Sequence, residues 1–404
     1  MIKPVGSQCN MRCAYCYYLP VNISGGKLMT EETLEVMIKN YLSNCGETAS
    51  FVWHGGEPTL CGIPFFEKAV ELQKKYRRDG QQMWNNLQTN GLLLDDKWCS
   101  FLKENSFDVG LSIDGTETIH DHFRKDAGGN ATYKRIRENI LRLKTFGIRP
   151  DLLCTVNSET AKRPLEVYET LRDLGTGWIQ FIPVLNKDED LSVRPESVGI
   201  EEYGDFLAII FNRWLYHDLG KVNVQLFIEM INTMAGGSPT LCWLQETCGQ
   251  VPVIEADGNV YSCDHFVREE NLIGNVRTSF EKIMEVPLQR DFGEKKRTGL
   301  TGKCLSCEFR KLCNGGCPKD RILVNERGEK GQYYYCESLK TLFRVAVPRI
   351  EELIELDRKR IPREEIMKTL LKNENSMWQG KGRNDLCPCG SGKKAKNCCW
   401  NRRS

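Results

Sequence analysis

The chain has 404 residues, more than one hydrophobic core normally supports, so two or three domains are expected. Its 56 lysines and arginines stand against 54 aspartates and glutamates, and the formal charge of +2 gives no overall field toward nucleic acid or an anionic membrane. No apolar run approaches the roughly 20 residues that span a bilayer, and no signal peptide is recognisable. We expect a cytoplasmic protein with neither a membrane nor a nucleic acid as partner.

The sequence contains 19 cysteines and only five histidines. Cytosolic thiols stay reduced, so this density indicates metal binding or catalysis rather than a disulfide framework. Thiolate ligation without imidazole favours iron–sulfur clusters or structural zinc. Most of the cysteines fall into three groups. Those outside the groups are expected to be ordinary buried residues: Cys45, Cys61, Cys99 and Cys154.

The first group is Cys9, Cys13 and Cys16, followed at once by Tyr17 and Tyr18. Three thiolates on a four-iron cluster leave one iron without a protein ligand, and an open coordination position separates reactive metal sites from structural ones. A zinc loop is the alternative, but no fourth thiol or histidine lies near in the sequence. The spacing therefore predicts a cluster whose open iron takes a substrate.

Between residues 49 and 184, short apolar runs alternate with amphipathic stretches, which is typical of strand–helix units in a parallel sheet. We expect strands over 49–57, 82–91, 107–115, 149–157 and 178–184, and helices over 63–78, 132–147 and 164–175. Polar or glycine residues end each strand, where α/β proteins gather functional groups. They could be ordinary turns, but their common position favours a shared ligand cavity. These strand ends are 55–57, 88–90, 112–114, 155–157 and 180–183.

Beyond about residue 235 the sequence changes to cysteines, glycines and short β-like pieces. Asp257 and Gly258 predict a hairpin within 251–263, and an amphipathic helix is expected over 338–360, bent by Pro348. The cysteines here can close two four-cysteine sites. Alternatively, the four closely spaced cysteines between residues 304 and 317 could form a zinc knuckle by themselves, and the other four would then form the second site. The cysteines of this region are Cys242, Cys248, Cys263, Cys304, Cys307, Cys313, Cys317 and Cys336.

The Cys-x3-Cys-x2-Cys spacing with its following aromatic residue, together with "HGGEP" at 54–58, resembles the radical S-adenosylmethionine (SAM) superfamily. The resemblance implies an α/β fold, a partial (β/α)6 barrel over 1–234, in which the amino and carboxylate groups of SAM occupy the open iron. Glycines let backbone carbonyls approach a small cation, and a glutamate offers charge near it. The implied SAM residues are Gly55, Gly56 and Glu57 for the amino group, Ser112, Asp114 and Arg124 for ribose and carboxylate, and Ile182 for the adenine face.

The second cysteine group resembles the SPASM extension of radical SAM enzymes, expected here over 235–360. The resemblance implies two auxiliary [4Fe-4S] clusters, so that the chain would hold three in all. Because protein supplies all their ligands, neither auxiliary cluster has an iron open to substrate, and electron transfer is the expected role. The implied ligands are Cys242, Cys248, Cys263 and Cys317 for one cluster, and Cys304, Cys307, Cys313 and Cys336 for the other.

Residues 2 to 355 most resemble the anaerobic sulfatase-maturating enzymes, through stretches such as "IKPVGSQCNMRCAYCYY", "WHGGEPTL" and "YSCDHFV". That family oxidises a Cys or Ser side chain of a sulfatase to formylglycine, which needs a cofactor-derived radical to remove a hydrogen from an unactivated β-carbon. The resemblance implies that Asp264 takes the substrate proton and that Tyr18 faces the substrate. Asp264 could instead cap a turn, and Tyr18 could simply pack near the cluster. His54 and His265 are expected to orient neighbouring groups.

The implied partners are an unfolded sulfatase or peptide substrate and an electron donor such as flavodoxin or ferredoxin, and a monomer is expected. Two other functions stay open. A SPASM enzyme that crosslinks or epimerises ribosomally made peptides is disfavoured, because Cys9 lies too near the start for the peptide-binding element that often precedes the cluster. A non-catalytic iron–sulfur and zinc binding module would leave the open cluster and residues 55–57 unexplained.

The end of the sequence departs from that family. After an expected short helix and linker over 361–381, residues 382–404 resemble the SEC-C zinc module. Zinc would fold a segment with so little core of its own, and its basic residues suggest docking to protein or nucleic acid. A solvated charged tail is the alternative. The implied zinc ligands are Cys387, Cys389, Cys398 and Cys399.

Overall fold

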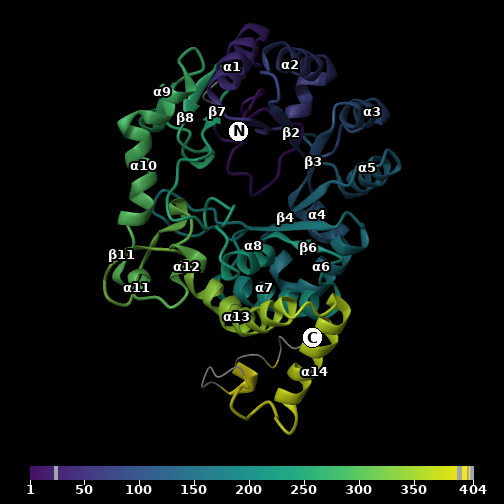
Figure 1. The fold of residues 1–404 in the computed structure, drawn as a ribbon, viewed down its shortest axis with the longest axis vertical. Helices are drawn as coiled ribbons and strands as arrows, with labels where there is room; N and C mark the ends of the chain where they lie inside the picture. Colours follow the sequence, from purple (N-terminus) through teal and green to yellow (C-terminus); the bar gives the residue numbers. More distant parts are fainter. Residues whose placement is uncertain (22–25, 389–393, 398–399, 401–404) are drawn as a thin grey trace. The chain divides into compact units, whose positions relative to one another are not determined.

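The computed structural model describes all residues except 22–25, 389–393, 398–399 and 401–404, and Figure 1 shows its helices and strands. The chain forms two compact units. The first contains residues 1–113, 117–153 and 247–298, and the second contains 114–116, 154–246 and 299–404. The two units are defined by which residues pack together and not by which cofactor they would bind. They therefore do not test the domain boundaries expected from the sequence, which stay predictions.

The first unit holds alternating helices and strands and a small antiparallel sheet. Strands β1, β2 and β3 pair side by side in parallel, and β7 and β8 form the expected hairpin at Asp257 and Gly258. The elements before the hairpin are α1 (Glu31–Asn44), β1 (Thr48–Trp53), α2 (Gly62–Tyr76), β2 (Gln82–Thr89), α3 (Asp96–Glu104), β3 (Phe107–Ser112), α4 (Glu117–Phe123) and α5 (Tyr133–Thr145). Those from the hairpin onward are β7 (Val253–Ile254), β8 (Asn259–Tyr261), β9 (Leu272–Asn275), α9 (Phe280–Glu285) and α10 (Pro287–Thr298).

The second unit is mainly helical. Its first elements are α6 (Pro164–Asp173), β5 (Trp178–Pro183), α7 (Ile200–His217), β6 (Asn223–Val224) and α8 (Gln225–Met234). Its later elements are α11 (Gly302–Leu305), α12 (Arg310–Cys313), β10 (Leu323–Val324), β11 (Lys330–Gln332), α13 (Cys336–Arg358) and α14 (Arg363–Trp378). Strand β4 (Asp151–Val156) begins in the first unit, where it pairs with β3. The six strands β1 to β6 follow one another in the sheet in sequence order, which confirms the parallel α/β arrangement.

Local sequence signals explain where these elements begin. Thr30 and Asp95 cap α1 and α3, because each side chain accepts a hydrogen bond from the backbone N–H of the residue three positions later, Thr33 and Trp98 respectively. In the hairpin, Gly258 has a φ of +84°, which glycine adopts without strain, and the Asp257 carboxylate accepts from the Asn259 N–H at 2.9 Å. The turn therefore forms from the residues that predicted it.

Aromatic side chains build the core of the first unit against β1 and β3. Phe66 of α2 packs edge-on against Trp53, Trp98 and Phe107, with ring centroids between 5.5 and 6.2 Å apart. These rings tie helices α2 and α3 to the sheet, which fixes the positions at which the neighbouring strands end.

The first residues of the chain lie between β1 and β7. The Ile2 N–H donates to the Val52 carbonyl and the Lys3 N–H to the Ile254 carbonyl, each at 2.8 Å. Ile2 forms bridges to both Trp53 and Ile254. The backbone just before the first cysteine group is therefore held on both sides.

Helix α7 forms the core of the second unit. Its buried side chains include Phe206, which contacts Phe181 of β5 with ring centroids 5.1 Å apart. Helix α13 packs along α7, and Gly204 allows the close approach because a β-carbon there would lie 3.0 Å from the Cα of Ser338 (Figure 1). Pro348 lies inside α13.

Most of the stretch expected as a short helix and linker is helix α14. Ile366, Leu370, Glu374 and Trp378 are buried at intervals of one helical turn. The carboxylate of Glu374 pairs with the guanidinium of Arg349, which is buried on α13. A charged sequence thus forms a docked helix because one of its charges has a buried partner.

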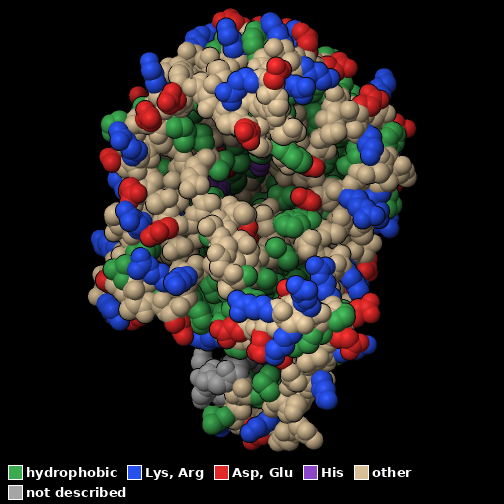
Figure 2. All heavy atoms as spheres, viewed as in Figure 1, with side chains coloured by type: hydrophobic (Ala, Val, Ile, Leu, Met, Phe, Trp, Pro, Cys, Tyr) green, Lys and Arg blue, Asp and Glu red, His purple; other side chains and the backbone are tan. Residues whose placement is uncertain are grey.

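The face shown in Figure 2 carries acidic and basic side chains intermingled, in keeping with the small net charge. No helix in the part of the chain that the structure describes has the length and apolarity to cross a bilayer.

Candidate active site

The glycine motif after β1 lies directly against the loop that carries the first cysteines. The Gly56 N–H donates to the Gly6 carbonyl and the Glu57 N–H to the Gln8 carbonyl, both at 2.8 Å. A β-carbon on Gly56 would lie 1.9 Å from the Gln8 carbonyl oxygen, so only glycine fits. Two segments expected to share one ligand are therefore neighbours.

The carboxylate of Glu57 is fully buried and joins the ends of β1 and β2. Its Oε1 accepts from the hydroxyls of Thr59 and Thr89 at 2.5 and 2.7 Å, and its Oε2 accepts from the Asn90 N–H at 2.7 Å. Burial raises the pKa of Glu57, and these hydrogen bonds act against that rise. The Glu57 carboxylate thus holds the ends of β1 and β2 together. A contact between Glu57 and SAM stays a prediction.

Cys9 receives hydrogen bonds from its surroundings. Its Sγ accepts from the Met11 N–H at 3.3 Å and from the Asn90 amide at 3.7 Å. Burial raises the pKa of the Cys9 thiol, while the bond from Met11 lowers it. N–H groups directed at sulfur suit a thiolate ligand. Asn90 belongs to a strand end singled out by the sequence, but its contact with Cys9 was not foreseen. Cys13 and Cys16 lie half-buried on the same loop.

The other predicted SAM residues lie at or near strand ends. Ser112 accepts from the Gln88 amide at 3.2 Å, and the Arg124 guanidinium, which is buried, donates to the Tyr15 hydroxyl at 2.9 Å. In the second unit, the fully buried Asp114 accepts from both the N–H and the hydroxyl of Thr155, and Ile182 on β5 is 37% exposed. Their roles toward SAM stay predictions.

Asp264 begins a short 3-10 helix directly after Cys263, in the same unit as the cysteine loop. Its Oδ2 accepts a hydrogen bond of 2.6 Å from the Tyr17 hydroxyl. Burial acts to raise the pKa of Asp264, but the charges of His265 and Lys3 and the bond from Tyr17 outweigh it, so the pKa lies below its usual value. The group is held as a carboxylate. Tyr17 was not among the predicted site residues, whereas its neighbour Tyr18 was.

Tyr18, the predicted substrate contact, is 4% exposed and packs with Val253, Tyr261 and Val267. Its hydroxyl donates to the Glu255 carboxylate. The Lys3 Nζ lies 3.3 Å from the centre of the Tyr18 ring and has no hydrogen-bond partner among the described residues. A substrate role for Tyr18 stays a prediction.

The two histidines of the site contact neighbouring groups, and an orienting role for them stays a prediction. The Nδ1 of His54 accepts from the Gly55 N–H at 2.7 Å, and burial lowers the pKa of His54 to about 4, so the ring is neutral near pH 7. The ring of His265 lies beside that of Tyr17, with centroids 4.8 Å apart.

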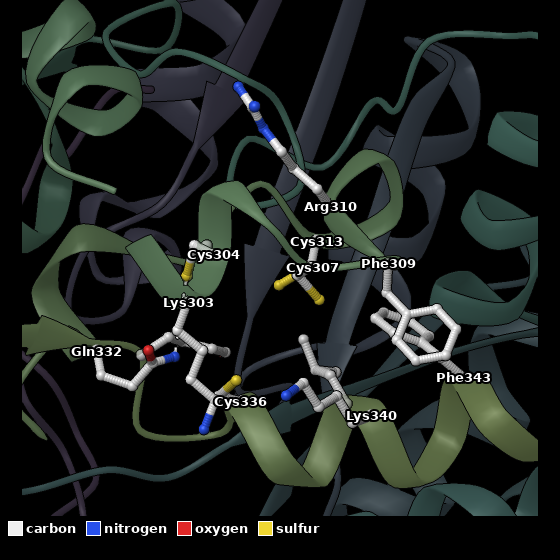
Figure 3. A pocket seen from close by; sticks show the side chains of 13 residues that line it. Lys303, Cys304, Cys307, Phe309, Arg310, Cys313, Gln332, Cys336, Lys340 and Phe343 are labelled. Carbon is white, nitrogen blue, oxygen red and sulfur yellow. Dashed lines mark hydrogen bonds between the residues drawn. The ribbon is translucent and has the colours of Figure 1, made fainter. Parts of the chain in front are cut away.

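A second candidate site lies within the second unit, where four cysteines line one cavity (Figure 3). They come from α11, the turn after it, the end of α12 and the first residue of α13, and Figure 3 shows their side chains directed into the cavity. The remainder of the lining combines the apolar side chains of Phe309, Leu339 and Phe343 with the basic side chains of Lys303, Arg310 and Lys340. These are the four cysteines that the resemblance assigned to one auxiliary cluster: Cys304, Cys307, Cys313 and Cys336.

Local structure fixes these four thiols. Thr301 caps α11 by accepting from the Cys304 N–H at 3.3 Å, and the Gln332 amide donates to Cys304 Sγ at 3.9 Å. Burial raises the pKa of Cys313 to about 12 and that of Cys336 to about 11. Neutral thiols of this kind lose their protons when they bind a metal group.

Among the described residues, no three His, Cys, Asp or Glu side chains converge closely enough to hold a single metal ion. Cys248 and Cys263 belong to the first unit, and Cys242 and Cys317 to the second, so their grouping as one ligand set stays a prediction. In the tail, Cys387 is buried. Cys389, Cys398 and Cys399 lie outside the described residues.

Three family descriptions match parts of the sequence. Residues 4–187 match the radical SAM superfamily, and residues 242–308 match the SPASM iron–sulfur cluster-binding domain. Residues 383–401 match the SEC-C motif. All three resemblances drawn from the cysteine groups are confirmed.

Curated relatives match nearly the whole chain. The serine-type anaerobic sulfatase-maturating enzyme of Bacteroides thetaiotaomicron is 36% identical over 369 residues, covering 86% of this chain and 89% of its own. The cysteine-type enzyme of Clostridium perfringens is 34% identical over 359 residues, covering 87% and 96%. A solved structure described as native anSMEcpe with bound AdoMet and Cp18Cys peptide superposes with a TM-score of 0.81 at 34% identity, covering 87% of this chain and 97% of that one. This chain belongs to the anaerobic sulfatase-maturating enzymes of the radical SAM superfamily.

Proposed function

We propose that this protein oxidises a Cys or Ser side chain of a sulfatase, or of a related protein or peptide, to Cα-formylglycine under anaerobic conditions. The observation that carries the proposal is the docking of the Gly55–Gly56–Glu57 backbone onto the loop of Cys9, in a chain that shares 34–36% identity with serine- and cysteine-type maturating enzymes.

The residues present fit a thiolate-bound cluster and SAM. The Cys9 sulfur accepts a backbone hydrogen bond, as a thiolate ligand does, and Gly56 leaves no side chain beside the loop. Cys9, Cys13 and Cys16 would hold a [4Fe-4S] cluster with one open iron. Gly55 to Glu57 would face the amino group of SAM, Ser112, Asp114 and Arg124 its ribose and carboxylate, and Ile182 its adenine.

When bound, SAM would supply the 5′-deoxyadenosyl radical that removes a hydrogen atom from the substrate β-carbon, and the auxiliary clusters would accept the second electron. Asp264 would take the proton of the substrate thiol or hydroxyl. Its carboxylate is held ionised by His265, Lys3 and Tyr17, so it carries no proton of its own when the substrate binds. A Cys substrate leaves this step as a thioaldehyde, which water converts to the aldehyde with release of hydrogen sulfide.

The auxiliary clusters are supported most directly by the cysteine-lined cavity in the second unit, because its four thiols surround a space rather than one point. A cubane needs such a space, whereas a tetrahedral zinc ion needs converging ligands. We assign Cys304, Cys307, Cys313 and Cys336 to one cluster, and Cys242, Cys248, Cys263 and Cys317 to the other.

The partners follow from this chemistry. The substrate would be an extended segment of an unfolded sulfatase or a peptide, and the electron donor a flavodoxin or ferredoxin. We further propose a monomeric, cytoplasmic protein whose C-terminal cysteines bind zinc.

The test is anaerobic incubation of the reconstituted protein with SAM, dithionite and sulfatase-motif peptides that differ only in Cys or Ser, followed by mass spectrometry. A converted Cys peptide exchanges one sulfur and two hydrogens for one oxygen, and a converted Ser peptide loses two hydrogens. The Asp264→Asn variant should cleave SAM but form little aldehyde, while Asp291→Asn, an exposed aspartate on α10, serves as the control. A mass-neutral product carrying solvent deuterium at an α-carbon would instead indicate an epimerase.

A further inference from the structure

We propose that Tyr17 is a positioning residue that orients the carboxylate of Asp264 for proton transfer. The inference rests on the proposed role of Asp264 as the base. Tyr17 directly follows Cys16 in the sequence and directly precedes Tyr18, the tyrosine that the resemblance assigned to the substrate.

The contact is specific in its geometry. The Tyr17 hydroxyl donates to Oδ2 of Asp264 at 2.6 Å, across a separation of 247 positions in the sequence. A phenol bonded to a carboxylate at this distance forms a strong, charge-assisted hydrogen bond. The Tyr17 ring also lies beside the His265 ring, so contacts from two neighbouring residues fix it.

This hydrogen bond determines which carboxylate oxygen can act. Oδ2 is engaged by Tyr17, and within the part of the chain that the structure describes the carboxylate makes one other hydrogen bond, the long contact of 3.7 Å from Cys263 Sγ to Oδ1. A cysteine that ligates a metal is a thiolate and has no proton to donate. Oδ1 is therefore the oxygen left to accept a proton from a substrate, and Tyr17 sets its direction.

The two adjacent tyrosines have different surroundings. Tyr18 is buried with its hydroxyl on Glu255, so its loss would disturb packing. Tyr17 is 45% exposed, and little apolar area depends on it. A Tyr17→Phe change keeps the ring and removes one oxygen, so it tests the hydrogen bond without unfolding the site.

The experiment compares Tyr17→Phe with Tyr76→Phe, in the wild type and in Asp264→Asn. Tyr76 is the matched control, because its hydroxyl also donates to a carboxylate at 2.6 Å, that of Glu35 on α1. The measured quantities are the ratio of 5′-deoxyadenosine to modified peptide, the affinity for a labelled peptide by fluorescence anisotropy, and the electron paramagnetic resonance spectrum of the reduced protein.

Tyr17→Phe should lower the yield of modified peptide by about 10- to 100-fold, the cost of a misplaced reacting group, while SAM cleavage, peptide affinity and the spectrum stay unchanged. In Asp264→Asn it should cause no further loss, because the two residues act as one unit. The proposal would be overturned if Tyr17→Phe turned over as fast as Tyr76→Phe. It would also be overturned if Tyr17→Phe lowered the yield by the same factor in Asp264→Asn as in the wild type, or if it weakened peptide binding or the cluster signal.

Failure of the proposed function looks different. If the wild type modifies the peptide in another way, the ratio of 5′-deoxyadenosine to that other product is measured instead, and the same comparison of variants tests the Tyr17 proposal. If it modifies neither peptide, the proposed function fails, and urea unfolding of the two single variants and the double variant decides whether the contact exists. Additive shifts of the unfolding midpoint would then reject it.

Discussion

Gly56 faces the Gln8 carbonyl oxygen so closely that any β-carbon would lie 1.9 Å from it. The contact joins the glycine motif to the backbone that leads into Cys9. A Gly56→Ala change should lower the free energy of unfolding by about 1–3 kcal/mol or more, because backbone must move. It should also lower the iron bound after reconstitution. Urea denaturation and iron analysis measure both effects. The control is Gly46→Ala, where the added carbon would meet nothing within 4 Å. Equal effects of the two changes would contradict this account.

The Glu57 carboxylate accepts from donors at both oxygens. In Glu57→Gln, the amide nitrogen faces either the Thr59 N–H or the Asn90 N–H, so one buried backbone donor loses its acceptor. We expect a loss of about 1–3 kcal/mol in unfolding free energy and weaker SAM binding. Glu71→Gln, which removes an exposed pair with Lys68, should change stability by about 0.5 kcal/mol or less. Isothermal calorimetry with SAM and urea denaturation give the two values; unchanged stability in Glu57→Gln would refute the argument.

Helix α14 is held by a buried pair. Arg349 donates to Glu374, to the Tyr216 hydroxyl and to the Val345 carbonyl. Glu374→Ala leaves the guanidinium buried without its anion and should cost about 3–5 kcal/mol. Limited proteolysis should then cut within 363–378. The control Glu355→Ala removes an exposed pair with Lys359 on α13 and should cost about 0.5 kcal/mol or less. Protease resistance in Glu374→Ala would show that apolar packing alone docks the helix.

His120 makes stability depend on pH. It is fully buried, and its Nε2 donates to the Thr132 hydroxyl, because that hydroxyl's own hydrogen goes to the Arg124 carbonyl. Burial, and then the charge of Arg124, hold the pKa of His120 well below its usual value. Below about pH 6.5 the unfolded chain therefore binds a proton at His120 that the folded chain does not bind. As the pH is lowered, the free energy of unfolding falls by up to about 1.4 kcal/mol per pH unit.

A His120→Gln variant keeps a donor toward Thr132 and removes this titration. Its unfolding free energy should fall less than that of the wild type between pH 7.5 and 5.5, as followed by urea denaturation at each pH. Parallel pH profiles for the two proteins would contradict the assignment.

The parallel strands, the hairpin and the cysteine loop could be predicted because each depends on local sequence. Strands β1 to β5 coincide with the apolar runs, and Gly258 stands where the turn needs a positive φ. The family could be predicted because the spacing of Cys9, Cys13 and Cys16 and the "HGGEP" stretch are continuous sequence motifs that carry the resemblance.

The contacts of Tyr17 and the length of α14 could not be predicted, because both depend on partners distant in sequence. Nothing local distinguishes Tyr17 from Tyr18, and only the position of Asp264 shows which hydroxyl reaches the carboxylate. Likewise, Glu374 looks like a surface residue until Arg349 is seen beside it.

The bonds from Lys3 to Ile254 and from Ile2 to Val52 also set an order of events during translation. The ribosome synthesises the cysteine loop first, yet strand β7, which pairs with the backbone before that loop, is complete only when residue 254 has emerged. Contacts this distant form late and slowly. The support around the cysteine loop is therefore complete only after the hairpin has been synthesised, and a nascent chain arrested before residue 254 would hold the loop on the β1 side alone.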